Sequence, residues 1–234
     1  MTHDFKSKEF DDIYFSIDDG LAETKYIFID SNHLTTRWDT FAEEIFRIGE
    51  LGFGTGLNYF ITLDEWSKQK NVPNLTFYSL ERYPLIVSEL IALPKLFPSL
   101  KVWGSELLLS YQNFLNQYSN HKDSQNHFTW ETAHPTQNKK FILNLYIGDI
   151  LSTLPLFETP IHAFYLDGFA PKKNPDMWSE EVFNCIDKLS LPGTTVATFT
   201  AAGFVKRNLE KIGFTVSKQK GYGRKREMLV GFHA

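Results

Sequence analysis

The feature that most constrains this chain is a glycine-rich turn between an apolar run and a helix-like stretch. The run 45–48 is typical of the end of a buried strand, and residues 57–66 repeat their apolar side chains with a helical period. Glycine permits a positive φ and the close approach of a ligand to the main chain, and the amides of a helix N-terminus face such a turn. The pattern therefore predicts a strand, a ligand-binding turn and a helix. The turn has three glycines at alternate positions: Gly52, Gly54 and Gly56.

The residues around these glycines distinguish two classes of cofactor site. A dinucleotide-binding turn has the pattern G-x-G-x-x-G, but Leu57 stands where its third glycine would be. Glu50 instead resembles the acid of motif I, E/D-x-G-x-G-x-G, in class I S-adenosylmethionine-dependent methyltransferases. A positively charged sulfonium ligand needs no phosphate cradle and tolerates a nearby carboxylate. A glycine turn alone is also compatible with a purely structural role, so the decision depends on later positions.

Two further acids follow apolar runs that are typical of strands. Residues 75–80 predict a second buried strand that ends on Glu81, and residues 141–147 predict another, followed by Asp149. Ligands of open α/β sheets bind beyond the carboxyl ends of the strands. We therefore expect Glu81 to accept hydrogen bonds from ribose hydroxyls. In class I methyltransferases an aspartate at the position of Asp149 lies beside the adenine amino group. Alternatively, the two acids are ordinary residues of a strand end and a turn.

A third acid ends the apolar run 163–166 and begins the block Asp167-Gly168-Phe169-Ala170-Pro171. This block resembles the reaction-centre motif D/N-P-P-Y/F of amino-group methyltransferases. Methyl transfer is an in-line displacement, so its rate depends mainly on orientation. We expect Asp167 to hold the N–H of an amine acceptor or to accept its proton, and Phe169 to stack on a flipped-out base. Alternatively, Asp167 caps the next segment and Phe169 fills the core.

The order of the predicted elements gives the fold class. Strands and helices alternate from residue 45 onward and end in a strand pair, which is the layout of an α/β, Rossmann-like class I methyltransferase domain with a seven-stranded sheet at 45–234. The runs 14–17 and 26–29 have β-type composition and flank the turn 18–20, so a hairpin is predicted. Residues 1–44 are therefore expected to form a small β-rich extension packed on the catalytic domain.

Composition excludes several other classes of protein. A single cysteine, Cys185, leaves no intrachain disulfide and no cysteine metal cluster, and the seven histidines lack metal-ligand spacing, so no metal site is expected. The nucleophile elbow of hydrolases and the phosphate loop of nucleotide hydrolases are both missing from the sequence. Apolar runs fall short of the roughly 20 residues that span a bilayer, and the N-terminus has no signal-peptide character. We expect a cytoplasmic protein without membrane contact.

The net charge of −4 conceals an asymmetry along the chain. Residues 1–30 hold eight acids and three lysines, whereas residues 204–227 hold eight bases and two acids. A local basic face can contact phosphates whatever the total charge. The alternative is a solvated helix and hairpin, and the charge distribution alone does not decide between the two.

Several blocks together carry a more specific resemblance. The block D-G-F-A-P-K-K-N-P-D-M-W at 167–178 and the block G-Y-G-R-K-R-E-M-L at 221–229 resemble the methyltransferase half of the bacterial bifunctional tRNA 5-methylaminomethyl-2-thiouridine biosynthesis proteins of MnmC type. Further matches at 10–16, 20–24, 50–58 and 197–204 extend the resemblance over nearly the whole chain. It implies transfer of a methyl group from S-adenosyl-L-methionine to the exocyclic amine of 5-aminomethyl-2-thiouridine at the tRNA wobble position. The product would be 5-methylaminomethyl-2-thiouridine.

The resemblance also assigns roles by position. Glu81 would hold the cofactor ribose, Asp149 the adenine, and Asp167 with Phe169 the modified uridine. The full expected cofactor-binding set is Glu50, Gly52, Phe53, Gly54, Thr55, Gly56, Asn58, Glu81 and Asp149. The residues expected to contact tRNA phosphates are Lys172, Lys173, Arg224, Lys225 and Arg226. Bifunctional members continue into a flavin-dependent domain, whereas this chain stops at Ala234, so a stand-alone transferase without a flavin domain is expected.

Two other functions stay open. The first is a class I methyltransferase or a polyamine aminopropyltransferase that acts on another amino acceptor, for which the basic hairpin at 221–229 would be irrelevant. The second is a non-catalytic RNA-binding module on a degenerate fold. The second is disfavoured because the acids and glycines that the cofactor needs are all present.

Overall fold

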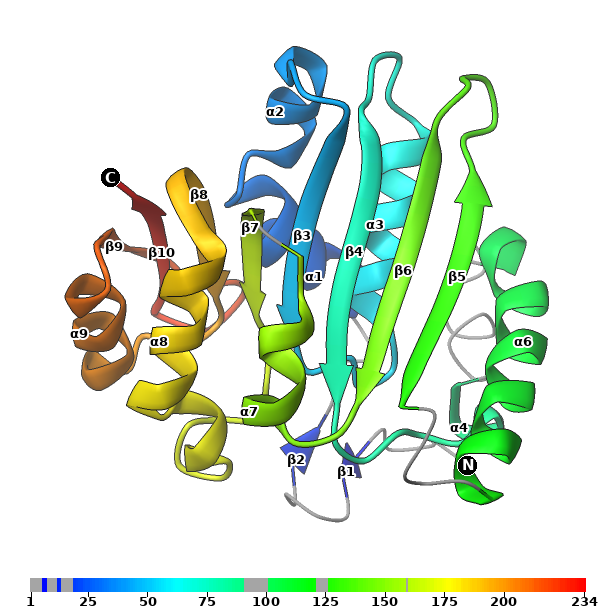
Figure 1. Ribbon diagram of the computed structural model, residues 1–234. Helices are drawn as coiled ribbons and strands as arrows, with labels where there is room; N and C mark the ends of the chain where they lie inside the picture. The colour runs from blue at the N-terminus through cyan, green and yellow to red at the C-terminus, as the bar shows by residue number, and fades with distance from the viewer. Residues whose placement is uncertain (1–5, 8–11, 14–18, 91–100, 121–125, 159) are drawn as a thin grey trace.

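One mixed sheet of eight strands organises the computed structural model, which describes residues 6–7, 12–13, 19–90, 101–120, 126–158 and 160–234 (Figure 1). In spatial order the strands are β5 (His127–Ala133), β6 (Lys140–Ile147), β4 (Asn74–Glu81), β3 (Ile45–Leu51), β7 (Ile161–Leu166), β8 (Ser190–Thr198), β10 (Glu227–His233) and β9 (Phe214–Lys220). The five strands from β6 to β8 pair in parallel, and β5, β10 and β9 run antiparallel to their neighbours. The predicted alternating layout is confirmed, but the sheet has eight strands where seven were predicted.

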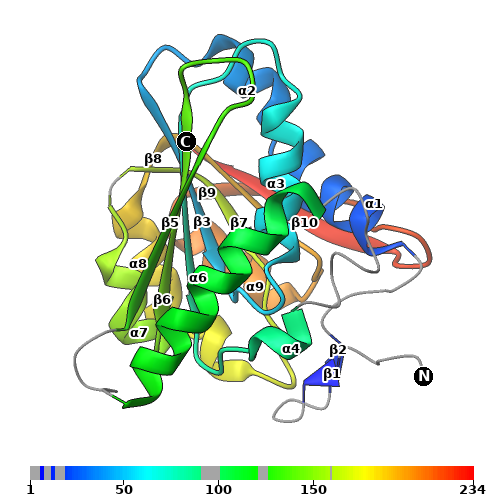
Figure 2. The ribbon, with the colours of Figure 1, turned by 90° about the vertical axis from the view of Figure 1, so that its right-hand side faces the viewer.

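Helices cover both faces of this sheet. Figure 1 shows α7 and α8 in front of the strands and α3 behind them, and Figure 2 shows the two layers from the side. The helical elements are α1 (Gly20–Thr24), the π-helix η1 (Lys25–Asp30), α2 (Leu34–Thr40), α3 (Leu57–Ser67), α4 (Val87–Leu90), α6 (Lys101–Asn120), α7 (Ile150–Thr153), the 3-10 helices η3 (Leu154–Leu156) and η4 (Pro175–Trp178), α8 (Glu180–Leu189) and α9 (Gly203–Lys211). Among the described residues, no helix is long and apolar enough to cross a membrane.

Alternation along the strands divides the buried side chains into two cores. In β7, Ala163 and Tyr165 belong to the core beneath η1, α2, α3 and α6, whereas Phe164 and Leu166 belong to the core beneath α7, α8 and α9. Successive side chains of a strand point to opposite faces, so a central strand with helices on both sides must be apolar throughout. This requirement explains the uninterrupted apolar runs of the sequence.

The register brings the strands to one level at their carboxyl ends. Leu51 of β3 lies opposite Leu80 of β4 and Leu166 of β7. The residues that follow these three positions are Gly52, Glu81 and Asp167, so they leave the sheet at the same edge. The sequence-predicted turn and two of the predicted acids are thereby brought together.

The predicted N-terminal hairpin is wrong at its second strand, because residues 25–30 form the π-helix η1. Ile27, Phe28 and Ile29 are all buried against the sheet, whereas a strand would turn alternate residues away from it. Packing on both sides of this segment therefore overrides its β-type composition. The hairpin's first strand, 14–17, lies outside the described residues, and β1 (Lys6–Ser7) and β2 (Asp12–Ile13) form a short antiparallel pair before it. The division of the chain at residue 44 stays a prediction.

Burial of α2 in the main core predicts a large loss of stability when its apolar side chains are shortened. Leu34→Ala is expected to lower the free energy of unfolding by about 2–5 kcal/mol, because Leu34 is 0% exposed and its removal leaves a cavity. The matched change Leu109→Ala in α6 removes a side chain that is 66% exposed and should alter stability by less than about 0.5 kcal/mol. Chemical denaturation of both variants measures the difference, and equal effects would show that α2 does not belong to the core.

Candidate active site

A cavity of about 650 Å³ lies at the carboxyl ends of the central strands. Its lining comes from the segments that follow the five parallel strands, from α1 and η1, and from the β9–β10 turn. Such a position is where open α/β sheets bind their ligands, and the volume suits a molecule of cofactor size. The lining residues at the ends of β3, β4, β6 and β7 include Gly52, Phe53, Gly54, Thr55, Leu57, Asn58, Leu80, Glu81, Arg82, Tyr83, Gly148, Asp149, Ile150, Asp167, Gly168, Phe169 and Ala170.

The glycines of the turn after β3 are required by geometry. Gly52, Gly54 and Gly56 have φ values of 97°, 53° and 75°, which L side chains rarely adopt. A Cβ atom on Gly52 would also lie 2.4 Å from the main-chain oxygen of Asp167, and one on Gly56 would lie 2.8 Å from the ring of Phe53. The turn after β3 and the loop after β7 therefore touch through backbone atoms.

Glu81 faces the cavity from the end of β4 and is fixed there by main-chain amides. Its Oε2 accepts a hydrogen bond from the amide of Gly54 at 2.9 Å, and its Oε1 accepts one from the amide of Tyr83 at 2.8 Å. Burial raises the pKa of Glu81, and the hydrogen bonds from Tyr83, Gly54 and Arg82 oppose that rise. The carboxylate is thus held rigidly beside the glycine turn, where it can accept hydrogen bonds from a diol.

Asn58 links two acids at the base of the cavity. Its Nδ2 donates to Oε1 of Glu50 at 2.8 Å and to Oδ2 of Asp167 at 2.6 Å. Oε2 of Glu50 accepts a second hydrogen bond from the Ser79 hydroxyl at 2.5 Å. Glu50 is 0% exposed and does not line the cavity. The geometry makes Glu50 a support for Asn58, behind the surface that a ligand would touch.

Asp167 lines the cavity from the end of β7. Burial raises its pKa from the ordinary 3.8 to about 6, and the hydrogen bond from Asn58 and the charge of Lys225 limit that rise. A carboxyl group with this pKa is ionised at neutral pH and takes up a proton more readily than an ordinary aspartate. Phe169 lines the cavity two residues later, and its main-chain oxygen accepts a hydrogen bond from the indole of Trp178 at 3.1 Å.

Asp149 caps a helix and also lines the cavity. Its Oδ1 accepts a hydrogen bond from the amide of Leu151 at 3.0 Å, which caps α7. Its Oδ2 lies 3.4 Å from Nη1 of Arg82, and both residues line the cavity. The aspartate is therefore a helix cap that also borders the ligand space.

The predicted basic residues divide into two groups. Lys225 lines the cavity, where its Nζ lies 2.8 Å from Oε1 of Glu23 and 5.2 Å from the centre of the Phe199 ring. The other four, which are exposed as Lys225 is, do not line the cavity: Lys172, Lys173, Arg224 and Arg226. They lie beside lining residues in the sequence, so phosphate contact stays a prediction for them.

The acidic N-terminal segment and the basic C-terminal hairpin meet in the structure. Tyr222 donates a hydrogen bond to Asp19, the Tyr26 hydroxyl donates to the main-chain oxygen of Lys220 at 2.8 Å, and Lys225 pairs with Glu23. Part of the charge asymmetry of the sequence is therefore compensated within the molecule.

Sequence reasoning missed the cavity residues that lie outside the strand-end motifs. These are Glu23, Thr24, Ile27, Phe28, Arg82, Tyr83, Asn174, Asp176, Met177 and Phe199. Arg82 and Tyr83 directly follow Glu81, so the strand-end argument could have included them. The contribution of α1 and η1 depends on contacts across the whole chain, and only the motif at 20–24 hinted at it. Among the described residues, no group of three or more His, Cys, Asp or Glu side chains could hold a metal ion.

Comparison with known proteins connects this geometry to one enzyme family. The family described as S-adenosyl-L-methionine-dependent methyltransferase matches residues 111–234. The chain is 39% identical to the tRNA 5-methylaminomethyl-2-thiouridine biosynthesis bifunctional protein MnmC of Pseudoalteromonas translucida (strain TAC 125), over 96% of this chain and 34% of that protein. It is 42% identical to the protein of the same name from Leptospira borgpetersenii serovar Hardjo-bovis (strain JB197), over 96% of this chain and 33% of the relative. The chain thus spans about a third of the length of these curated relatives.

A solved structure gives the same fold. The crystal structure of MNMC2 from Aquifex aeolicus matches with a TM-score of 0.69 at 19% identity, over 97% of this chain and 66% of that one. At this identity the match concerns the fold alone. The predicted α/β class I architecture is confirmed, since this fold comes with the family match at 111–234.

The amide of Asn58 is expected to hold down the pKa of Asp167. Asn58→Leu removes the hydrogen bond to Oδ2, so the pKa of Asp167 should rise above about 6. Titration of the Asp167 side-chain carbon signal by NMR measures this directly and needs no catalytic activity. Asn71→Leu changes an exposed asparagine outside the cavity and should leave the pKa where it is. An unchanged pKa in Asn58→Leu would show that the amide does not stabilise the charged form.

Proposed function

Since the chain belongs to the S-adenosyl-L-methionine-dependent methyltransferase family, we propose that it methylates the exocyclic amine of 5-aminomethyl-2-thiouridine at the wobble position of a tRNA. The product is 5-methylaminomethyl-2-thiouridine. The observation that carries the proposal is the similarity to MnmC proteins over 96% of the chain, combined with Asp167 at the cavity wall. The location that follows from a tRNA substrate is the cytoplasm.

The cavity residues suit the cofactor of this family. Glu81 is fixed by two amides with its carboxylate toward the cavity, which suits the two ribose hydroxyls. The glycines carry no side chain, so the methionine portion can approach the main chain closely. Asp149 with Arg82 borders the end assigned to adenine. Glu50 contributes indirectly, by orienting Asn58. When bound, the cofactor supplies an electrophilic methyl group on a sulfonium sulfur.

Asp167 has the properties that methylation of an amine requires. The acceptor must present a neutral nitrogen lone pair in line with the methyl group, and rate is gained by holding it there. The Asp167 carboxylate accepts an N–H of the amine and receives the proton released as the new C–N bond forms. A pKa of about 6 keeps this group ionised at neutral pH and still basic enough to take the proton. Asn58 keeps the carboxylate oriented.

The tRNA part of the proposal is supported by aromatic and basic residues around Asp167. Phe169 lines the cavity beside the aspartate and offers a face on which a flipped-out base stacks. Lys172 and Lys173 follow the lining residue Ala170, and exposed arginines flank Lys225 on the hairpin. Cations beside the entrance of a base-binding cavity are suited to the flanking phosphates.

Nucleoside mass spectrometry tests the proposed function directly. The purified protein with S-adenosyl-L-methionine should convert 5-aminomethyl-2-thiouridine in tRNA to the methylamino form, with the mass increase of one methyl group. Cells that lack the gene should accumulate the aminomethyl nucleoside. A protein that binds the cofactor, leaves this nucleoside unchanged and methylates or alkylates a small amine instead would contradict the proposal and favour another amino acceptor.

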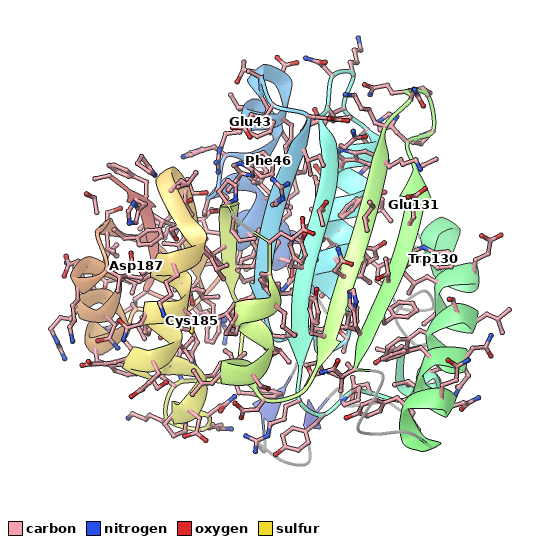
Figure 3. All side chains as sticks on the ribbon, viewed as in Figure 1. Glu43, Phe46, Trp130, Glu131, Cys185 and Asp187 are labelled. Carbon is pink, nitrogen blue, oxygen red and sulfur yellow. The ribbon has the colours of Figure 1, made fainter. Side chains whose placement is uncertain are left out.

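Replacement of Asp167 should separate catalysis from cofactor binding. Asp167→Asn keeps the size of the side chain but cannot take up the proton, so methyl transfer should fall by at least about 100-fold while cofactor affinity persists. Asp187→Asn alters an acid on α8, outside the cavity, and serves as the control (Figure 3). Single-turnover methylation and calorimetric titration give the two readouts. Loss of cofactor affinity together with activity would instead make Asp167 a cofactor ligand.

Replacement of Glu81 should mainly weaken the binding of the cofactor. Glu81→Ala removes a charged acceptor and is expected to reduce affinity by about 10–100-fold. The matched change Glu131→Ala affects an acid on the edge strand β5, toward the opposite end of the sheet, and should leave affinity unaltered (Figure 3). Isothermal titration calorimetry measures both, and an unchanged affinity in Glu81→Ala would remove Glu81 from the site.

A further inference from the structure

An ion pair between the two ends of the chain forms part of the cavity wall. Glu23 belongs to α1 and Lys225 to the turn between β9 and β10, 202 residues later. Lys225 Nζ donates to Oε1 of Glu23 at 2.8 Å, and both residues line the cavity. This contact uses one of the three ammonium hydrogens and one of the two carboxylate oxygens. The pair therefore presents a hydrogen-bond donor and a hydrogen-bond acceptor side by side.

The pair lies close to Asp167 and to an aromatic ring. The charge of Lys225 lowers the pKa of Asp167, and the charge of Glu23 raises it to a smaller extent. Lys225 Nζ also lies 5.2 Å from the centre of the Phe199 ring, which lines the cavity as Phe169 does. These contacts place the pair near Asp167, at the part of the cavity that the proposed function assigns to the acceptor.

Neighbouring contacts fix the position of the pair. The Tyr26 hydroxyl donates to the main-chain oxygen of Lys220 at 2.8 Å, and the rings of Tyr26 and Tyr222 lie 5.7 Å apart. Tyr222 also donates a hydrogen bond to Asp19. The hairpin is therefore attached to α1 and η1 next to the ion pair, which brings the donor and the acceptor together without a ligand. Preorganisation of this kind favours recognition of a complementary edge.

We propose, on the basis of the proposed function, that Lys225 and Glu23 read the O4 and N3–H edge of the acceptor ring and thereby select a uracil over a cytosine. Uracil offers an acceptor, O4, beside a donor, N3–H, which complements an ammonium beside a carboxylate. Cytosine offers the reverse order, an N4 amino donor beside the acceptor N3. Cytosine would place its amino donor against the ammonium and its N3 lone pair against the carboxylate. A site whose polar groups are left unpaired in this way strongly disfavours the ligand.

The positions of the groups on the ring suit this assignment. The aminomethyl group is attached to C5, next to the carbon that bears O4, and N3 is one ring atom further away. With the amine at Asp167, O4 comes next and N3–H after it. Phe169 and Phe199 offer faces for stacking of the ring in this orientation.

The test compares two acceptors in one RNA framework. Anticodon stem–loop RNAs carry either 5-aminomethyluridine or 5-aminomethylcytidine at the wobble position, and kcat/KM for methyl transfer is measured for each. The wild-type protein should prefer the uridine by ~10–100-fold, the range of a good two-point base contact. Glu23→Gln should lower this preference at least ~10-fold, because the amide also donates to N3 of cytosine. Lys225→Met should reduce methylation of the uridine selectively.

Two further variants distinguish recognition of the base by the ion pair from an ion pair that only connects two segments of the chain. Lys218→Met breaks a comparable ion pair, Lys218–Glu227 at 2.6 Å, on the same hairpin but outside the cavity, and should leave the preference intact. Lys225→Arg keeps a charged donor and should retain the preference for uridine. It also provides a folded reference if Lys225→Met does not fold.

Three results would overturn the inference. Equal methylation of both acceptors by the wild-type protein would show that the cavity does not read this edge. An equal loss of kcat/KM for both acceptors in Glu23→Gln and Lys225→Met would show that the pair only connects two segments of the chain. The proposed function would then stand. Absence of methyl transfer to either RNA by the wild-type protein, with cofactor binding intact, would overturn the proposed function and the inference together.

Discussion

The side-chain amide of Asn58 donates hydrogen bonds to two carboxyl groups, which would repel each other if both were charged. Glu50 at the end of β3 and Asp167 at the end of β7 both accept from its Nδ2, while Ser79 of β4 donates to Glu50. Three adjacent parallel strands are thereby connected at the edge where the cavity opens. Gly52 permits this arrangement, since a side chain there would collide with the main chain of Asp167. The glycine turn after β3 and the position of Asp167 therefore depend on each other, and together they shape this part of the cavity.

This arrangement has a thermodynamic cost that the surrounding core offsets. Burial raises the pKa of Asp167 to about 6, so the charged form is disfavoured in the folded protein. The stability linked to this group is fully present below its ordinary pKa of 3.8 and is lost as the pH rises through about 6. At neutral pH the site therefore opposes folding. The adjoining aromatic residues supply compensating contacts, since Tyr165 stacks on Phe28 at 4.8 Å and meets the Phe77 ring edge-on at 5.7 Å.

Local patterns of the sequence predicted the parts of the site that lie on single strand ends. The glycine turn, Glu81 and Asp167 were found because each directly follows a buried strand, and strand ends meet at one edge of a parallel sheet. The strand predicted at 26–29 was wrong because packing on both sides of η1 overrides β-type composition. The ion pair between Lys225 of the basic hairpin and Glu23 was not predicted, because no local pattern of the sequence reports a contact across 202 residues.

The two ends of the cavity therefore differ in how the sequence encodes them. The end proposed for the cofactor consists of loops that follow parallel strands, so short motifs specify it. The end proposed for the acceptor is lined by α1, η1 and the β9–β10 turn, whose positions depend on contacts such as the one between Tyr26 and Lys220. A chain can retain every cofactor motif while substitutions in these segments change which acceptor it binds. For this reason the motifs alone left other amino acceptors open, and the choice of substrate has to be sought where the two ends of the chain meet.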